Sequence, residues 1–348
     1  MTTSMRGEIM QEISILGAGF SCIDIIKSGI DAKYNIGGTA ANVVSILSQL
    51  GMKTSLLIPR YNDQYAELFS KELQRRKVHV IEFKQSTLAT PRVIEHCDDS
   101  GKHFFETRCS ECGKYLSKVS LPSSANIQKL ENHIWQDLNV FFLDRISDGI
   151  KLGIQKARDS YAWVYYEPNC CRQFTSFYNN IAQADIVKFS EEIISQNYID
   201  RILWDLNENS KTKLIIISQG HNGLKYSLKA HDGTFGEWVH LKPFQIDNIV
   251  DTSGAGDWLA ASFLWYFLRM FPKAQDYLPP DIIKQLLIDS QIIAAYSCLY
   301  LGAQGIFSAP DGTTFLRNRF NREIDILPPI VLDSLNDHLC KNCLSPLV

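Results

Sequence analysis

The chain has 348 residues, 45% of them hydrophobic, which is enough for one large domain or two modest ones. Its formal net charge of −3 gives no electrostatic reason to expect nucleic acid or an anionic membrane as a partner. No run approaches the roughly 18 apolar residues of a membrane span, and the first residues lack the apolar core of a signal peptide. With nine cysteines read as mostly reduced thiols, these features predict a cytoplasmic protein.

Short apolar runs alternate with helical patterns along most of the chain. The predicted strands are residues 13–19, 54–59, 139–144, 162–168, 184–189 and 213–218. The predicted helices are residues 40–50, 65–76, 148–158 and two apolar helices after residue 256. Alternation of this kind implies an α/β protein whose mostly parallel sheet is covered by helices on both faces.

Residues 90–108 interrupt the alternation, because they form two strand patterns around the turn DDSG at 98–101, with no helix between them. A hairpin here can be a lid over a site or merely a peripheral element. The residues alone leave both interpretations open.

The segment DTSGAGD, residues 251–257, precedes an apolar helix. We expect a strand over 247–250, a glycine turn, and a helix whose first N–H groups are unpaired and favour an anion. Asp257 falls in the first helical turn, where the helix terminus should keep it ionised at neutral pH. A tight turn with a capping aspartate explains the same residues equally well.

Two further segments carry candidate binding residues. In GGTAAN, Gly37 and Gly38 permit close backbone approach to a ligand, and Asn42 lies in the first turn of a helix. Taken alone, that segment fits an ordinary glycine turn better. Asp24 ends an otherwise apolar first strand, where an acid is costly unless it binds something.

The order of these motifs resembles the ribokinase family of PfkB-type carbohydrate kinases. The resemblance rests on GAG at 17–19, GGTAAN at 37–42, DTSGAGD at 251–257 and LGAQG at 301–305, and it spans residues 13–308. It implies one kinase domain over 13–325: a three-layer α/β/α sandwich around a mostly parallel sheet, with a small β lid. The lid would draw on residues 20–38 and 90–108, while 1–12 form a tail and 326–348 an appendage.

The resemblance also implies the reaction, which is transfer of the γ-phosphoryl group of ATP to a hydroxymethyl group with Mg²⁺. Asp257 would be the base, and the amides of Gly254, Ala255 and Gly256 would form the anion hole. A sugar-like acceptor would be bound by a polar group of residues from several segments. These are Asp24, Gly37, Gly38, Asn42, Asp144 and Arg145.

The implied nucleotide and metal residues lie mostly in the second half of the chain. Those for ATP are Ser218, Gly220, Gly223 and Thr252, and those for a monovalent cation such as K⁺ are Asp251 and Ser253. The family commonly has an N-x-x-E string whose glutamate organises magnesium. Here Ser190 replaces the asparagine and Ile193 the glutamate, so Glu192 is the expected substitute.

Three other interpretations remain open at this point. A nucleoside kinase of the same fold would use Phe104 or Phe105 as an aromatic clamp in the lid, and a non-catalytic ligand sensor would keep the fold without the reaction. Two CxxC pairs, at 109–112 and 340–343, have zinc-site spacing. A homodimer formed through the lid is a further expectation from the family.

Overall fold

The computed structural model describes residues 12–28, 31–97, 103–109, 112–116, 118–206 and 210–331. A nine-stranded sheet in the order β13-β12-β11-β10-β9-β8-β1-β4-β5 forms its centre, and every pairing except those of β12 and β13 is parallel. The strands are β1 Ser14–Ala18, β4 Lys53–Tyr61, β5 His79–Leu88, β8 Leu138–Leu143, β9 Trp163–Tyr166, β10 Ile186–Ser190, β11 Leu214–Ser218, β12 Leu224–Leu228 and β13 Val239–Leu241. The predicted parallel sheet is confirmed.

Helices cover both faces of this sheet, each contributing to one of two apolar cores. The first core holds α1 Thr39–Gln49, α2 Gln64–Arg75, α8 Ala255–Met270, α9 Pro280–Ser297 and α10 Pro310–Phe320. The second holds α3 Ser124–Gln128, α4 His133–Gln136, α5 Asp148–Asp159, α6 Phe174–Ile181 and α7 Gln196–Asp205. Within the part of the chain described, no helix combines the length and the apolar character needed to cross a membrane.

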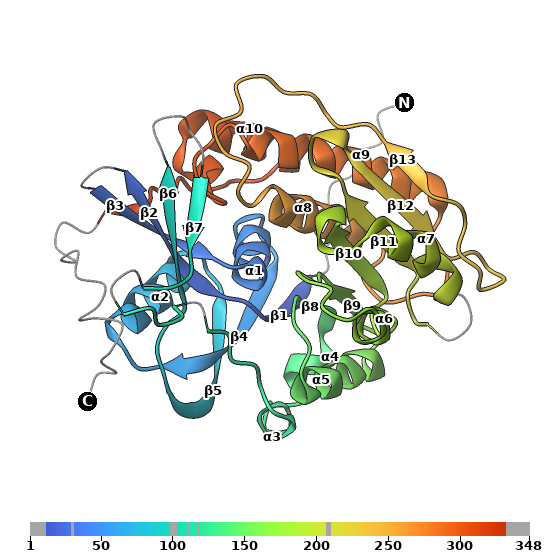
Figure 1. Cartoon of the computed structure of the whole chain (residues 1–348), viewed down its shortest axis with the longest axis horizontal. Helices are drawn as coiled ribbons and strands as arrows, with labels where there is room; N and C mark the ends of the chain where they lie inside the picture. Colours follow the sequence, from blue (N-terminus) through green and yellow to red (C-terminus); the bar gives the residue numbers. More distant parts are fainter. Residues whose placement is uncertain are drawn as a thin grey trace.

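A second, five-stranded sheet in the order β14-β3-β2-β6-β7 lies beside α1 and α2, away from α5 and α6 (Figure 1). Its strands are β2 Cys22–Ser28, β3 Asp31–Gly37, β6 Arg92–Cys97, β7 His103–Glu106 and β14 Ile330–Val331. The strands β6 and β7 pair antiparallel as the predicted hairpin, although its turn lies outside the described residues. The segment expected to be an appendage supplies β14, which pairs with β3.

Two expectations about local structure are wrong. Residues 247–250 are not a strand, because Ile249 and Val250 are exposed and the chain instead hydrogen-bonds to the end of α9 through Val250 N–H and Cys298 O, 2.8 Å apart. The first strand ends at Ala18, so Asp24 does not terminate it. Asp24 lies inside β2, in the small sheet.

Candidate active site

Four neighbouring parallel strands carry polar side chains at or near their carboxyl ends, and these strand ends together form one edge of the large sheet. Asp144 follows β8, Glu167 follows β9, Lys188 lies in β10 and Ser218 ends β11. Because side chains alternate along a strand, each of these polar side chains points to the same face of the sheet as the residue two positions before it. The four preceding residues all belong to the core that includes α8. The alternation therefore directs all four polar groups toward the face of the sheet that α8 covers.

The turn into α8 requires glycine at its last position. Gly254 has φ of 75°, and a Cβ added there would lie 2.4 Å from the Cβ of Ala303. The two loops are also tied together, because Asp251 accepts the N–H of Gly302 at 2.7 Å and Trp258 donates its indole N–H to Ala303 O at 2.8 Å. The loop 302–304 therefore braces the turn from behind.

Three backbone N–H groups at this turn have no acceptor among the described residues: those of Gly254, Gly256 and Asp257. Ala255 differs, since its N–H donates to Thr252 O at 3.2 Å. The free amides therefore include that of Asp257 in place of the predicted Ala255. A group of free amides at a helix N-terminus favours an anion.

The carboxylate of Asp257 is held at this turn by a chain of amide side chains. Asn42 Nδ2 donates to Asp257 Oδ2 at 2.7 Å, and Gln304 Nε2 donates to Asn42 Oδ1 at 2.9 Å. Burial, followed by the nearby Glu167 carboxylate, raises the pKa of Asp257 to about 8, while Lys188 and the Asn42 hydrogen bond act in the opposite direction. The expectation that the helix terminus alone keeps Asp257 ionised at neutral pH is wrong, because desolvation outweighs it.

Lys188 and Glu167 form a buried ion pair beside the same turn. Their side chains are only 2% and 13% exposed, and Lys188 Nζ donates to Glu167 Oε1. A Cβ added to Gly256 would lie 3.2 Å from Lys188 Nζ, so glycine at this position leaves room for the pair. Burial raises the pKa of Glu167, and the charge of Lys188 opposes that shift.

Gly37 leaves room for Asp24 within the small sheet, and Gly38 lets the start of α1 approach the loop after β1. A Cβ on Gly37 would lie 2.0 Å from the Asp24 carboxylate, and one on Gly38, where φ is 86°, would lie 2.5 Å from Phe20 O. Burial raises the pKa of Asp24 to about 7, although the thiol of Cys22 donates to its carboxylate at 3.3 Å. The predicted residues Asp24, Gly37 and Gly38 are therefore brought together.

Asp144 and Arg145 hold the loop after β1. Asp144 Oδ1 accepts the N–H of Phe20 at 2.8 Å, and the guanidinium of Arg145 lies over the Phe20 ring, 5.6 Å from its centroid. Arg145 also donates to Asp144 O at 2.9 Å. The Arg145 side chain is 23% exposed, so it can also face a ligand.

Several buried side-chain atoms around this edge make no hydrogen bond with any described residue. They are Ser21 Oγ, Tyr165 Oη, Glu167 Oε2 and Gln304 Oε1, whereas Asp144 Oδ2 lies 3.4 Å from Arg145 Nη1 in an ion pair. Buried polar atoms are normally paired, because leaving one unpaired costs about 1–3 kcal/mol. Such a concentration of unpaired groups fits a site shaped for a polar ligand with several hydroxyl groups.

The predicted nucleotide residues lie at the neighbouring end of β11. Ser218 ends that strand, exposed Gly220 begins the short helix η2 Gly220–Asn222, and Gly223 has φ of 91° where a Cβ would meet Leu241 O at 2.2 Å. Thr252 is exposed at the turn before α8. Gly220 and Thr252 are therefore exposed at this edge, whereas Gly223 is tightly packed.

The candidate metal-binding carboxylates differ in how many hydrogen bonds they already accept from the protein. Glu191 and Glu192 form η1 Glu191–Ile193 directly after β10; Glu191 accepts from Gln219 at 2.8 Å, while Glu192 is exposed. Both carboxylate oxygens of Asp251 accept backbone N–H groups, those of Ser253 and Gly302. Carboxylates at η1 therefore fit hydrated Mg²⁺, whereas that of Asp251 braces the turn.

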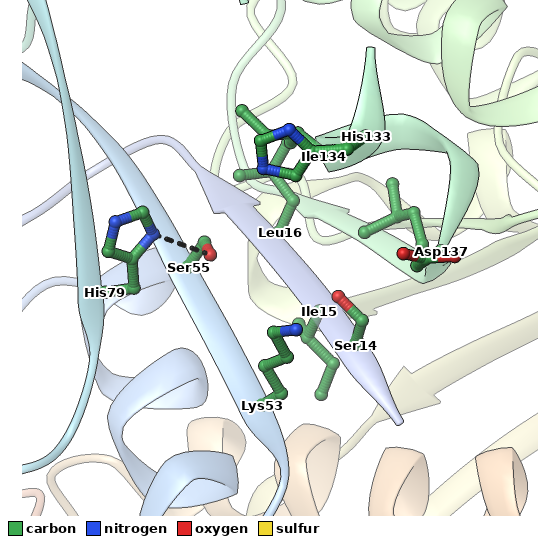
Figure 2. Close-up of a pocket in the computed structure, with 10 residues that line it drawn as sticks. Ser14, Ile15, Leu16, Lys53, Ser55, His79, His133, Ile134 and Asp137 are labelled. Carbon is green, nitrogen blue, oxygen red and sulfur yellow. Dashed lines mark hydrogen bonds between the residues drawn. The ribbon is translucent and has the colours of Figure 1, made fainter. Parts of the chain in front are cut away.

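A pocket of about 300 Å³ lies at the other edge of the sheet, where β1, β4 and β8 begin (Figure 2). Lys53, His79, His133 and Asp137 line it, but none of the predicted site residues does.

Of the two CxxC pairs, Cys109 is buried and Cys112 is exposed, and the second pair lies outside the described residues. The described part of the chain contains no group of three or more His, Cys, Asp or Glu residues arranged for a metal.

Sequence reasoning assigned no role to four residues of this site: Tyr165, Glu167, Lys188 and Gln304. The available signal was a charge within or directly after an apolar strand, as with Lys188 in IVKFS and Glu167 after WVYY. Tyr165 and Gln304 carry no comparable signal, because a tyrosine in an apolar strand and a glutamine in a loop are ordinary.

The fold is that of a known class of kinases. The family model described as pfkB family carbohydrate kinase matches residues 7–275. The chain therefore belongs to the pfkB family of carbohydrate kinases. No curated protein sequence matches it.

Solved structures of such kinases share the fold. A fructokinase with bound ATP from Xylella fastidiosa is 16% identical with a TM-score of 0.65, the match covering 85% of this chain and 94% of that one. The ribokinase of Giardia lamblia is 14% identical with a TM-score of 0.65, covering 84% and 94%. The aminoimidazole riboside kinase of Salmonella enterica is 17% identical with a TM-score of 0.63, covering 88% and 99%. The predicted ribokinase-like fold is confirmed.

Proposed function

We propose that this chain transfers the γ-phosphoryl group of ATP to a hydroxymethyl group of a sugar or sugar-like alcohol, with Asp257 as the base. One observation carries the proposal. The Asp257 carboxylate lies in the helical turn that offers the free N–H groups of Gly254, Gly256 and Asp257, and Asn42 holds it there. A proton acceptor and an anion-binding turn in one place are what phosphoryl transfer to an alcohol requires.

In the proposed reaction the alcohol oxygen attacks the γ-phosphorus while the bond to the bridging β-oxygen breaks. ADP leaves with the electron pair of that bond, and the alcohol proton passes to Asp257. The free N–H groups donate to the phosphoryl oxygens as charge shifts toward the leaving group. Mg²⁺, held through water by Glu192 or Glu191, would neutralise phosphate charge when bound, and K⁺ near Ser253 would support the turn.

The acceptor is expected to be rich in hydroxyl groups. Asp24, Asn42 and Asp144 would offer acceptors and donors to it, and the buried atoms without hydrogen bonds around the site support a ligand that supplies partners. A nucleoside acceptor is the second candidate, supported by the likeness to an aminoimidazole riboside kinase and by Phe105, which is 58% exposed on β7.

ADP release in the presence of sugars, sugar acids and nucleosides tests the proposed function. Each acceptor that stimulates release is then identified by mass spectrometry as a product heavier by one phosphoryl group. We expect a sugar or sugar acid to give the highest kcat/KM. ATP binding without phosphorylation of any alcohol would instead indicate a ligand sensor that kept the fold.

We predict that Asp257→Asn abolishes transfer but changes ATP affinity only a few-fold. The variant keeps the side-chain shape and an oxygen that can accept from Asn42, but it cannot take a proton. Product formation is measured together with nucleotide binding by calorimetry. Turnover comparable to the wild type would remove Asp257 from the role of base.

A further inference from the structure

The Lys188–Glu167 pair is a buried charge pair that the fold does not require. The neighbours of Lys188 along β10, Val187 and Phe189, are buried apolar residues, and an apolar side chain at position 188 would continue the pattern. Buried ion pairs are often no more stabilising than apolar residues of similar volume, because desolvation offsets their attraction. Stability alone therefore gives no reason for an ammonium group at this place.

The ammonium group of Lys188 stands beside the free amides at the start of α8. Its Nζ would be 3.2 Å from a Cβ on Gly256, whose N–H has no acceptor among the described residues. Glu167 fixes the group there through one carboxylate oxygen, while the other, Oε2, is buried without a hydrogen bond. The positive charge thus lies beside the residue whose amide is free.

The charges around this space are mostly negative. The carboxylates of Glu167 and Asp144 both act on Asp257, and Lys188 is the cation that opposes them there. Arg145 is farther along the edge, where it donates to Asp144 O and lies over Phe20. A phosphoryl group entering such a site needs a positive charge close to its oxygens, since Coulomb repulsion in a water-poor site is strong.

We infer that Lys188 is a further catalytic residue, whose ammonium group contacts the transferred phosphoryl group beside the amides of Gly256 and Asp257. Glu167 is the positioning residue that holds this ammonium group. The role rests on the proposed function, because it presumes ATP at the turn before α8. It differs from a structural role in that the contact is made to the γ-phosphate and to neither the α- nor the β-phosphate.

The test compares binding of two nucleotides to Lys188→Met in the presence of Mg²⁺. The non-hydrolysable β,γ-methylene analogue of ATP carries a γ-phosphate, and ADP does not. Loss of one charge-assisted contact should weaken analogue binding about tenfold to a hundredfold, while ADP binding changes less than about twofold. Calorimetry on the purified full chain measures both dissociation constants, and Lys188→Arg should recover part of the analogue affinity.

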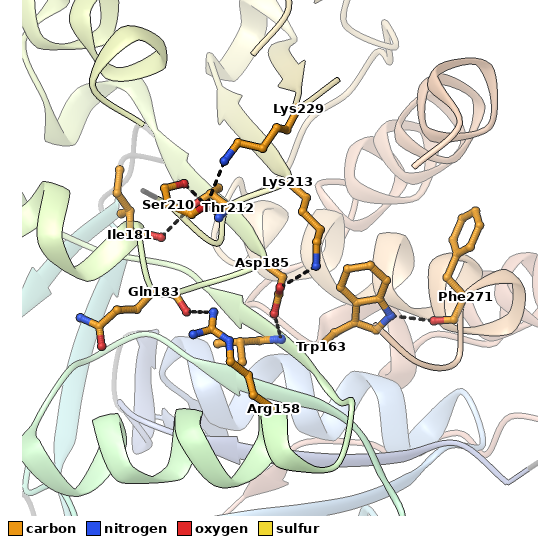
Figure 3. Close-up of polar contacts among 11 residues, drawn as sticks. Arg158, Trp163, Ile181, Gln183, Asp185, Ser210, Thr212, Lys213, Lys229 and Phe271 are labelled. Atoms are coloured by element: carbon orange, nitrogen blue, oxygen red, sulfur yellow. Dashed lines mark hydrogen bonds and ion pairs between the residues drawn. The ribbon is translucent and has the colours of Figure 1, made fainter. Parts of the chain in front are cut away.

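Lys213→Met is the matched control. Lys213 pairs with Asp185 at 3.1 Å, directly before β11 and β10 begin, so this pair lies at the opposite end of the strand that carries Lys188, near Trp163 (Figure 3). Its loss should leave both nucleotide affinities unchanged. Because Lys188→Met leaves Glu167 buried without its partner, the double variant with Glu167→Gln is measured as well. Its affinity for the analogue should fall as in Lys188→Met, while its affinity for ADP stays nearly unchanged.

Equal weakening of analogue and ADP, or no weakening of either, in a folded Lys188 variant would overturn the inference. The outcome is separate from that of the proposed function. If the wild type phosphorylates no alcohol, the proposed function fails, yet the two dissociation constants still decide whether Lys188 contacts a γ-phosphate. If alcohols are phosphorylated and the constants shift together, only the role of Lys188 fails.

Discussion

At Asp257 two electrostatic effects oppose each other. The N-terminus of α8 and the Asn42 hydrogen bond favour the ionised carboxylate, whereas burial and the charge of Glu167 favour the protonated form. The second pair of effects is larger, and the pKa rises to about 8. A carboxylate with this pKa is a stronger base than an ordinary aspartate, at the expense of being mostly protonated at neutral pH.

We predict that kcat/KM for the acceptor falls as the pH is lowered through about 8, because the enzyme–ATP complex that meets the acceptor must carry Asp257 unprotonated. Lys188→Met should move the midpoint to higher pH, since the lost ammonium group favours the ionised form. Initial rates across a pH series, with ATP saturating, measure both midpoints. A profile that is flat from about pH 6 to 9 in the wild type would contradict this assignment.

At the scale of elements, the junction between the turn and α8 depends on contacts with a distant loop. The loop 302–304 supplies Gly302 N–H to Asp251, Ala303 O to Trp258 and the Gln304 amide to Asn42. The helix N-terminus is thereby held in one orientation relative to α1. This bracing explains why the turn tolerates no side chain at Gly254, whose Cβ position is occupied by Ala303.

We predict that Gly254→Ala lowers kcat by about a hundredfold or more and destabilises the protein by about 1–3 kcal/mol. The added Cβ must displace Ala303, and alanine is strained at φ of 75°, so the free amides change direction. Gly233→Ala is the control, with φ of 85° and no atom within 4 Å of the added Cβ. Similar rates for both variants would show that the turn does not depend on Gly254.

At the scale of the whole molecule, the two sheets meet at a cluster of carboxylates. Asp24 and Glu95 come from the small sheet, Asp144 and Glu167 from the large one, and Asp257 from α8. Ser253 Oγ donates to Glu95 Oε1 at 3.3 Å and so links β6 to the turn. Burial raises the pKa of Asp24 to about 7 and that of Asp257 to about 8, so ionising these two carboxyl groups is unfavourable in the folded protein.

We predict that stability falls as the pH rises from about 5 to 8. The folded pKa values lie above the unfolded value of about 3.9, so between these values the folded protein retains protons that the unfolded chain has released. Unfolding then releases protons, so the free energy of unfolding decreases as the pH rises toward the folded pKa values. Urea unfolding at both pH values should show a loss about 3–4 kcal/mol smaller in Asp257→Asn than in the wild type. An equal loss of stability in the wild type and in Asp257→Asn would contradict a raised pKa at Asp257.

The sequence by itself determined the class of fold and the residues of the local motifs. Apolar runs such as IVKFS and LIIIS and the helix beginning at Thr39 have signals within a few neighbouring residues, so their elements were predicted within one or two positions. The strand expected over 247–250 was wrong, because Ile249 and Val250 have strand-forming side chains but no neighbouring strand to pair with. Asp24 was misplaced because its strand belongs to a different sheet from that of β1.

Only the tertiary structure decided which residues face Asp257 and whether that carboxylate carries a charge. Lys188, Glu167 and Asp144 stand on three strands spread over more than forty residues, and only the order of the strands and their alternating side chains bring them to one edge. Desolvation and Coulomb forces depend on distance in space, which the spacing along a chain does not give. The motif DTSGAGD could therefore be found by reading, while its electrostatic environment needed the fold.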